Sequence, residues 1–169
     1  MDFPRQTDTI FGDEDQKPSD MEQSIDTFIR ESADRLAIRQ LVDAYAFCAD
    51  TRDAKGQMAL FTPDTHFVVY MDSRSAQPSQ ELHSREALAP VFDNLNTYTA
   101  TMHFNGQHSV QLAGATATGT TYCLAHHWTE KEGKRTRMVA AIRYLDTFVK
   151  EEGNWYFAQR KLMVQWIDS

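Results

Sequence analysis

The chain has 169 residues, of which 41% are hydrophobic, so its length and composition suit a single domain with an ordinary buried core. Its formal net charge of −7 comes from residues 1–34, which hold ten acidic and three basic side chains, whereas residues 35–169 hold fourteen of each. This balance provides no basic stripe for nucleic acid, and no run approaches the roughly 18 apolar residues of a membrane span, so neither partner is expected.

The beginning of the chain is polar and acidic. We predict that residues 1–22 form a flexible extension and that residues 23–169 form the domain. No apolar run typical of a signal peptide follows Met1, so a cytoplasmic location is expected. Cys48 and Cys123 both lie within apolar patterns, which favours buried free thiols over a disulfide bond.

Three helices are predicted in the first part of the domain. The first carries an apolar stripe with three- and four-residue spacing, formed by Ile38, Leu41, Val42, Tyr45, Cys48 and Ala49. Asp53 is placed to cap a short second helix that runs through Phe61 and is ended by Pro63. The third helix is predicted from Ser84 to about Asn94.

The remaining segments are typical of strands. Thr65–Tyr70 is rich in β-formers, and a polar loop follows it. Four longer strands rich in Thr, Val and aromatic residues are expected at Met102–Leu112, Ala117–Thr129, Thr136–Lys150 and Asn154–Ile167. Gly133 and Gly153 mark hairpin turns. Helices followed by such a meander predict an α+β fold, in which a curved antiparallel sheet wraps around the long helix and encloses a ligand cavity.

The candidate chemistry rests on Asp50, His103, Tyr45, His127 and Arg160. At 100° per residue Asp50 lies off the apolar stripe, so periodicity does not show whether it points inward or serves as a cap at the helix end. His103 lies between apolar neighbours at the start of a strand, where it is either a hydrogen-bonded core residue or a functional group.

Two of the predicted strands place polar groups on apolar faces. Alternation puts Thr121, Cys123, Ala125 and His127 on one face of their strand. In the last strand Arg160 is expected to share a face with Tyr156, Ala158 and Leu162. An arginine in such surroundings needs an anion, a carboxylate or water, so a structural salt bridge is the alternative to an active-site role.

A metal site is the competing use of the six histidines, His66, His83, His103, His108, His126 and His127. His126 and His127 are adjacent and should point to opposite faces of a strand, so they cannot readily share one ion. No HExxH or CxxC pattern is present. We therefore expect no metal and no other cofactor.

An aspartate–histidine pair has a clear chemistry. The aspartate orients the imidazole and stabilises its protonated form, and the histidine abstracts a proton from carbon or oxygen. An arginine, a tyrosine or a second histidine then stabilises the developing negative charge or assists the leaving group. Such a set suits β-elimination, dehydration or isomerisation without a cofactor.

The segments Ala37–Asp53 and Leu60–Asp64 resemble the opening of SnoaL-like domains, and Gly153–Arg160 resembles their last hairpin. The resemblance covers roughly residues 30–168. It implies the cone-shaped α+β barrel of the cystatin-like and NTF2-like (nuclear-transport-factor-2-like) proteins, a fold that hosts many functions.

Within this family the chain most resembles the branch of scytalone dehydratase, bile-acid 7α-dehydratase and lindane dehydrochlorinase. Asp50 and His103 match the branch's catalytic pair, Tyr45 the tyrosine of the bile-acid enzyme, His127 the second histidine of scytalone dehydratase, and Arg160 the arginine of the dehydrochlorinase. Ala49 replaces the tyrosine that scytalone dehydratase carries before its aspartate. The resemblance also implies a cavity lined by Thr121, Cys123, Ala140, Ile142, Tyr144 and Met163.

The resemblance implies a cofactor-independent lyase or isomerase that acts on a small, mostly apolar cyclic molecule and assembles as a homotrimer or, alternatively, a dimer. In this interpretation His103 is the base and Asp50 its orienting partner. Two alternatives stay open, because the small subunit of aromatic-ring dioxygenases has the same fold and a ligand carrier could have the same pocket. Neither alternative needs Asp50 and His103 to face each other.

Overall fold

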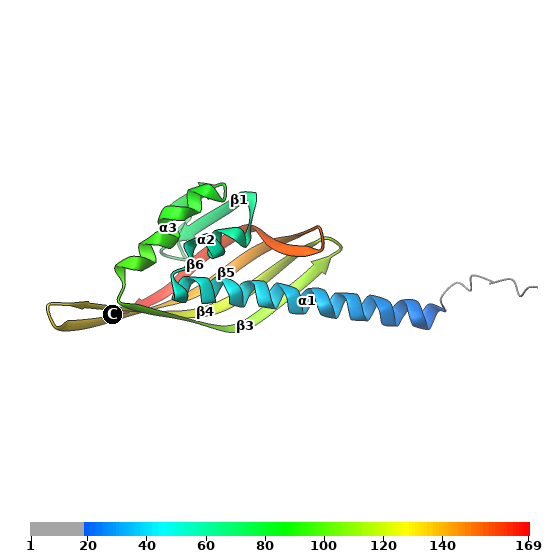
Figure 1. Ribbon diagram of the computed structural model, residues 1–169, viewed down its shortest axis with the longest axis horizontal. Coiled ribbons are helices and arrows are strands. Elements are labelled where there is room, and N and C mark those ends of the chain that lie inside the picture. The colour runs from blue at the N-terminus through cyan, green and yellow to red at the C-terminus, as the bar shows by residue number, and fades with distance from the viewer. Residues whose placement is uncertain (1–18) are drawn as a thin grey trace, which may run out of the picture.

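The computed structural model describes residues 19–169, which form helical segments packed against a six-stranded sheet (Figure 1). The helical elements are α1 (Asp20–Thr51), α2 (Ala54–Ala59), α3 (Ala89–Asp93) and the 3-10 turns η1 (Glu86–Leu88) and η2 (Asn94–Thr97). The strands are β1 (Phe61–Tyr70), β2 (Gln80–His83), β3 (Ala100–Ala113), β4 (Thr116–Lys131), β5 (Lys134–Glu151) and β6 (Asn154–Asp168). The α+β class predicted from the sequence is therefore confirmed.

Helix α1 begins well before the apolar stripe. Its N-terminus is fixed by a capping box, in which the Ser19 side chain accepts a hydrogen bond from the Glu22 backbone N–H and the Glu22 carboxylate accepts one from the Ser19 backbone N–H. Residues 20–22 of the predicted extension are thus helical and Ser19 caps the helix, whereas residues 1–18 lie outside the described residues. Figure 1 shows that the N-terminal half of α1 projects beyond the sheet.

The strands form one curved, unclosed sheet with the order β2-β1-β6-β5-β4-β3. Neighbouring strands are antiparallel except for β1 and β6, which are parallel. Irregular registers interrupt β3 and β6, and such bulges increase the local bend and twist of a strand. The concave face covers one side of the C-terminal half of α1, the side that carries the buried residues of the helix.

Two tight hairpins confirm the predicted turns. The β4–β5 turn consists of Glu132 and Gly133, with φ of 52° and 73°, and the β5–β6 turn consists of Glu152 and Gly153, with φ of 49° and 84°. Positive φ at both central residues matches the natural twist of paired strands, and glycine adopts it without a steric penalty.

The region between α2 and β3 differs from the prediction. Helix α2 is capped by Asp53 as expected, but Phe61 starts β1 instead of ending the helix. The segment Gln80–His83, for which no strand was predicted, pairs with β1 as a short edge strand. The predicted third helix is divided into short pieces around Pro90, which lacks a backbone N–H and enters at the first turn of α3.

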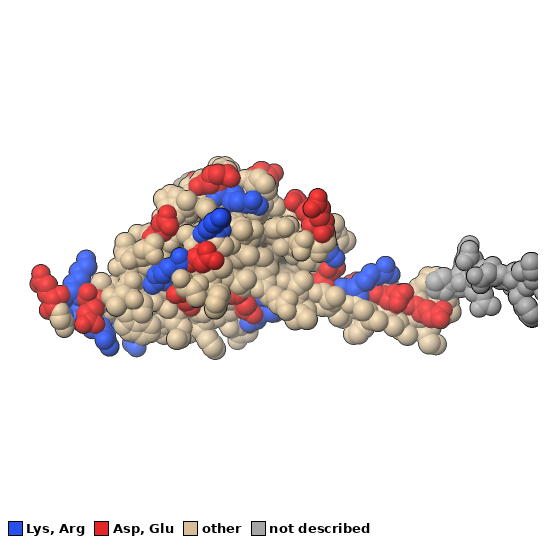
Figure 2. Space-filling model, in the orientation of Figure 1, with Lys and Arg blue, Asp and Glu red and all other residues tan. Residues whose placement is uncertain are grey.

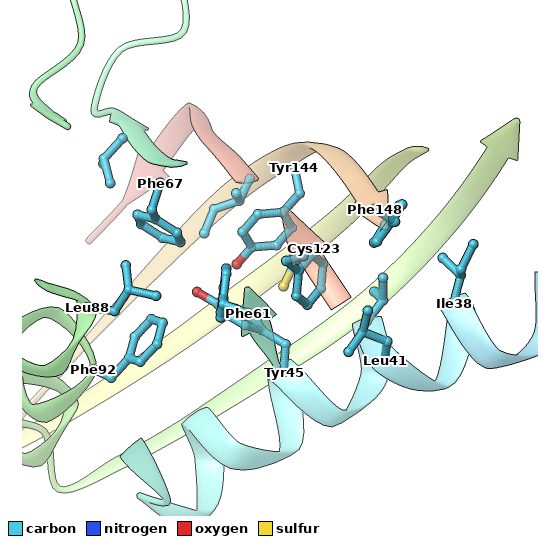
Figure 3. Close-up of a cluster of buried hydrophobic side chains, with 14 of the residues drawn as sticks. Ile38, Leu41, Tyr45, Phe61, Phe67, Leu88, Phe92, Cys123, Tyr144 and Phe148 are labelled. Carbon is cyan, nitrogen blue, oxygen red and sulfur yellow. The ribbon is translucent and has the colours of Figure 1, made fainter. Parts of the chain in front are cut away.

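The core lies between α1 and the concave face of the sheet (Figure 3). The stripe of α1 contributes Ile38, Leu41 and Tyr45, which are buried against aromatic side chains from the strands. Both cysteines are free: Cys123 is buried, which raises the pKa of its thiol to about 12, and Cys48 is half-buried. A thiol with so high a pKa is a packing residue and not a nucleophile.

The surface agrees with the neutral charge balance of the folded part. On the face shown in Figure 2, acidic and basic side chains are interspersed over the body of the molecule. No helix within residues 19–169 is long and apolar enough to cross a bilayer.

Candidate active site

A cavity of about 280 Å³ lies inside the curve of the sheet, between α1, the α3 region and the strands. Aliphatic and aromatic side chains make up most of its wall, including Phe67, Val69, Phe92, Ile142 and Leu162. The polar groups in the wall are Tyr45, Gln57, Gln80, Asn94, Tyr98, His103, His127 and Tyr144. A mostly apolar hollow with a few polar groups is the usual form of a small-molecule site.

Asp50, in the last turn of α1, and His103, at the start of β3, are hydrogen-bonded to each other. Asp50 Oδ1 lies 2.8 Å from His103 Nδ1, and Asp50 Oδ2 accepts a 2.8 Å hydrogen bond from the His103 backbone N–H. These two contacts fix the imidazole both in position and in rotation.

Asp50 reaches His103 from the flank of α1, because β3 runs beside that flank. The Asp50 carboxylate also accepts a 2.9 Å hydrogen bond from Thr101 Oγ1, and Arg52 donates to the same hydroxyl oxygen at 2.6 Å. Arg52 adopts the left-handed conformation at the helix C-cap, with φ of 64°, and its side chain also donates to the Ala49 carbonyl. The end of α1 is therefore tied to β3 by a short polar network.

The hydrogen bonds that Asp50 accepts determine its protonation state. Burial alone would raise its pKa, but the hydrogen bonds from the His103 ring and backbone N–H hold the pKa below its ordinary value. Asp50 is consequently ionised at neutral pH and can only accept hydrogen bonds. Nδ1 of His103 must then carry a proton, which in the neutral imidazole leaves the lone pair on Nε2. His103 lines the cavity, so Nε2 is the nitrogen available to a ligand.

His127, on β4, lies beside His103 in the cavity wall. The two rings are perpendicular with centroids 5.6 Å apart, and Tyr98 packs on His127 at 4.6 Å. Burial lowers the pKa of His127 to about 4, and the nearby His103 contributes in the same direction. His127 is therefore neutral at physiological pH and offers one N–H donor. Its Nδ1 is buried without a hydrogen-bond partner among the described residues.

Tyr45, on α1, is buried at the inner end of the cavity and makes edge contacts with Phe61, Phe92 and Tyr144. Burial raises the pKa of its phenol to about 12, so Tyr45 stays protonated and can donate a hydrogen bond. Figure 3 shows Tyr45 and Tyr144 pointing into the interior from α1 and β5.

Arg160 does not reach the cavity. Its fully buried guanidinium forms a two-pronged ion pair with Asp146, with N–O distances of 2.8 and 2.9 Å. Its Cζ also lies 4.0–4.2 Å from the ring centres of Tyr45, Tyr144 and Phe157. Burial alone would lower the pKa of Arg160, but the Asp146 carboxylate raises it. The structure thus shows the salt bridge that was the alternative to an active-site role.

The face predicted for Arg160 is correct for Leu162 but wrong for Tyr156 and Ala158, because β6 is bulged before Arg160. Thr147 pairs with Gln159 whereas Phe148 pairs with Phe157, so Ala158 is an extra residue. The alternation therefore shifts by one, and Phe157 instead of Ala158 shares the buried face with Arg160.

Of the six residues expected to line the cavity, Ala140, Ile142 and Tyr144 do so. Thr121 and Cys123 are buried in the sheet but are not part of the wall. Met163 faces the other side of the sheet, and its neighbours Leu162 and Val164 line the cavity in its place.

Sequence reasoning did not identify the polar wall residues Gln57, Gln80, Asn94 and Tyr98, nor Thr101, which supports Asp50 from outside the wall. Gln57 on α2 is buried in the wall, its amide N–H donates to the Tyr45 carbonyl, and its Oε1 has no partner. Tyr98 follows a 3-10 turn, and Thr101 supports Asp50. None of these positions carries a motif. Only the hydrophobic context of Gln57, next to Met58 in a capped helix, hints at burial.

The comparisons with known proteins agree with this architecture. A model of the SnoaL-like domain family matches residues 30–161. No curated protein matches the chain in sequence. Among solved structures, a protein of Novosphingobium aromaticivorans proposed to be a scytalone dehydratase is 23% identical with a TM-score of 0.71, covering 82% of this chain and 88% of that one.

Two further structures share the fold. A type 2 hexachlorocyclohexane dehydrochlorinase is 14% identical with a TM-score of 0.70, covering 83% of this chain and 90% of that one. An NTF2-like protein with a cystatin-like fold from Novosphingobium aromaticivorans is 23% identical with a TM-score of 0.69, covering 87% of this chain and 92% of that one. The chain belongs to the SnoaL-like domain family of the NTF2-like, cystatin-like fold.

Proposed function

We propose that this protein is a cofactor-independent lyase of the dehydratase or dehydrohalogenase type, or an isomerase, that acts on a small cyclic molecule in the cavity. The observation that carries the proposal is the hydrogen-bonded pair of Asp50 and His103 in the cavity wall. The pair leaves Nε2 of His103 as an oriented base.

In the proposed reaction, His103 Nε2 takes a proton from a carbon atom of the substrate. The electron pair of the broken C–H bond forms the new double bond as the bond to the hydroxyl or halide leaving group breaks. Asp50 stabilises the imidazolium that forms, because its carboxylate is already ionised and hydrogen-bonded to Nδ1. No electron acceptor is needed for this step.

His127 and Tyr45 are the proposed hydrogen-bond donors to the substrate. Both are neutral at physiological pH and both belong to the cavity wall. Donors held in a site with little water stabilise negative charge that develops on a substrate oxygen or a leaving group. Arg160 contributes only indirectly in this proposal, because its guanidinium packs against the ring of Tyr45 and helps to position it.

The cavity favours a compact and mostly apolar substrate. Its volume of about 280 Å³ lies just below the usual range for ligand pockets, roughly 300–1,000 Å³. A one- or two-ring compound suits this space better than a four-ring steroid. Two of the structural relatives bear the names of a dehydratase and a dehydrochlorinase, and both names denote elimination reactions.

We also propose that the chain forms a homo-oligomer through the outer face of its sheet. Exposed apolar side chains gather there, namely Met102, Phe104, Tyr122, Leu124 and Trp166. Monomeric proteins rarely expose so many large apolar groups on adjacent strands. The family resemblance favours a trimer over a dimer.

A panel of cyclic alcohols and halides, assayed for binding by calorimetry and for turnover by product analysis, tests the proposal. The expected result is turnover of at least one compound that is lost in His103→Ala, with binding retained. Binding without turnover in the wild-type protein would instead support a ligand carrier. Purification in complex with a much larger iron-bearing chain would support the dioxygenase-subunit alternative.

A further inference from the structure

A second cluster of chemically active side chains lies at the other edge of the sheet. His66 on β1 and His83 on β2 are directly paired across the two antiparallel strands, and Glu81 points to the same side two residues from His83. All three reach the surface, and none belongs to the cavity wall.

The donor atoms of this cluster converge. His66 Nε2 lies 2.6 Å from Glu81 Oε1, and His83 Nε2 lies 3.7 Å from the same oxygen. The two imidazole rings are stacked with centroids 4.5 Å apart and an angle of 11° between their planes. One donor atom from each residue lies within 4.8 Å of the other two.

Such spacing is close to that of ligands on one ion. Two nitrogen atoms bound to a tetrahedral metal at about 2.0–2.1 Å lie roughly 3.3 Å apart. Small rotations of the exposed His83 and Glu81 side chains bring the three atoms to this separation, because β1 and β2 already hold their backbones in register. The outward direction leaves a fourth position for water.

His66 also has the partner that a metal-bound histidine needs. Gln159, its neighbour on β6, places its side-chain amide nitrogen 2.8 Å from His66 Nδ1, so as it stands this amide donates to the ring. A half-turn of this amide presents its carbonyl oxygen, which accepts a hydrogen bond from Nδ1–H. In that orientation the hydrogen bond would fix the tautomer in which the Nε2 lone pair faces Glu81 and the ion.

We propose that His66, Glu81 and His83 form a binding site for a divalent transition-metal ion of the zinc class. Two imidazoles and one carboxylate suit Zn²⁺, Co²⁺, Ni²⁺ or Cu²⁺, whereas Mg²⁺ and Ca²⁺ prefer oxygen ligands. This inference is independent of the chemistry proposed for the cavity. It revises the expectation of no metal, which rested on linear motifs that a cross-strand cluster does not display.

A bound ion would cross-link the short strand β2 to β1. This link has a structural consequence for the cavity, because the Val69–Gln80 pair lies three register positions from the His66–His83 pair and both of its members line the cavity. Metal binding should therefore slow backbone amide exchange in β2 without contacting the ligand site.

Titration of the full chain with Zn²⁺, followed by calorimetry, tests the site, and Co²⁺ provides a visible absorption band that reports its coordination geometry. We expect one ion per chain. Replacing a ligand by His83→Ala or Glu81→Gln should weaken binding by more than the 10–100-fold typical of losing an outer-shell partner, and Gln159→Leu by about that amount. His126→Ala removes a histidine from the outer face of β4 and is the matched control.

His83 and Glu81 are exposed, so their variants should keep the fold, and circular dichroism verifies this. An excess of Mg²⁺ should not displace Co²⁺. Absence of Zn²⁺ binding by the wild-type chain would overturn the proposal. Binding that survives in His83→Ala but is lost in His103→Ala would also overturn it, by assigning the ion to the cavity.

Discussion

The Asp50 carboxylate of α1 accepts hydrogen bonds from both the ring and the backbone of His103 on β3, each at 2.8 Å. A contact to the ring alone would leave the strand free to move away from the helix end. The double contact links the orientation of the imidazole to the packing of α1 on the sheet, so the geometry of the proposed base is a property of the fold.

The first prediction concerns the charge on Asp50. Asp50→Asn keeps the shape of the side chain but removes the negative charge that stabilises a His103 imidazolium. We expect turnover to fall by about 10²–10⁴-fold, with ligand affinity nearly unchanged, as measured by product analysis and calorimetry. Asp43→Asn is the matched control, because Asp43 lies on the same flank of α1 and bonds to Asn105 away from the cavity. Equal losses in both variants would contradict the assigned role.

The second prediction concerns His127 and pH. Its pKa is about 4 in the folded protein and 6.5 ordinarily, so the unfolded chain binds more protons between these values. Its contribution to stability is therefore complete above pH 6.5 and is lost as the pH falls towards 4, with a slope of up to about 1.4 kcal/mol per pH unit. His127→Phe should remove this dependence of the unfolding free energy on pH, which is measured by urea denaturation at a series of pH values. A pH dependence identical to that of the wild type would disprove the assignment.

The same experiment has a matched control in the neighbouring residue. His126 points to the outer face and stacks on Trp128, with ring centroids 5.7 Å apart. His126→Phe makes the same exchange outside the cavity and is the control for the substitution itself.

The third prediction separates structure from catalysis at Arg160. Arg160→Met leaves the Asp146 carboxylate buried without its partner, which should lower the free energy of unfolding by about 3–5 kcal/mol. Adding Asp146→Leu removes that unpaired charge and should restore much of the loss, as measured by chemical denaturation. A single variant of unchanged stability that fails only in turnover would instead assign Arg160 to the reaction.

The fourth prediction concerns assembly. Phe104→Lys and Leu124→Lys place charges in the apolar outer face of the sheet, so light scattering should show a shift from oligomer to monomer. Phe28→Lys, which changes an exposed apolar residue on the projecting half of α1, is the comparison and should leave the sheet interface intact. Dissociation by Phe28→Lys alone would relocate the interface to the helix.

The sequence predicted the long strands and their turns well, because alternation and glycine position are local signals. It underestimated α1, whose projecting half lacks a buried stripe and is marked only by the Ser19–Glu22 capping box. The bulge at Ala158 has no sequence signature, so the faces of the last strand could not be assigned correctly.

In the candidate site, too, some features could be predicted from the sequence and others could not. The resemblance singled out Asp50 and His103 as a pair, whereas helical periodicity alone left the direction of Asp50 open. Asp50 lies on a flank of α1 that is covered only because β3 runs beside it, which is a tertiary property. The partner of Arg160, Asp146, lies on another strand and could not be identified from spacing within β6.

The most direct test of the central claim is chemical rescue of the proposed base. His103→Ala removes the imidazole and leaves a space beside Asp50, and turnover of a substrate found in the ring-compound panel is then measured with and without added imidazole. We expect turnover to be lost without loss of binding and to be partly restored by imidazole. Turnover that persists in His103→Ala, or that is lost in Asp43→Asn to the same extent, would contradict His103 as the base.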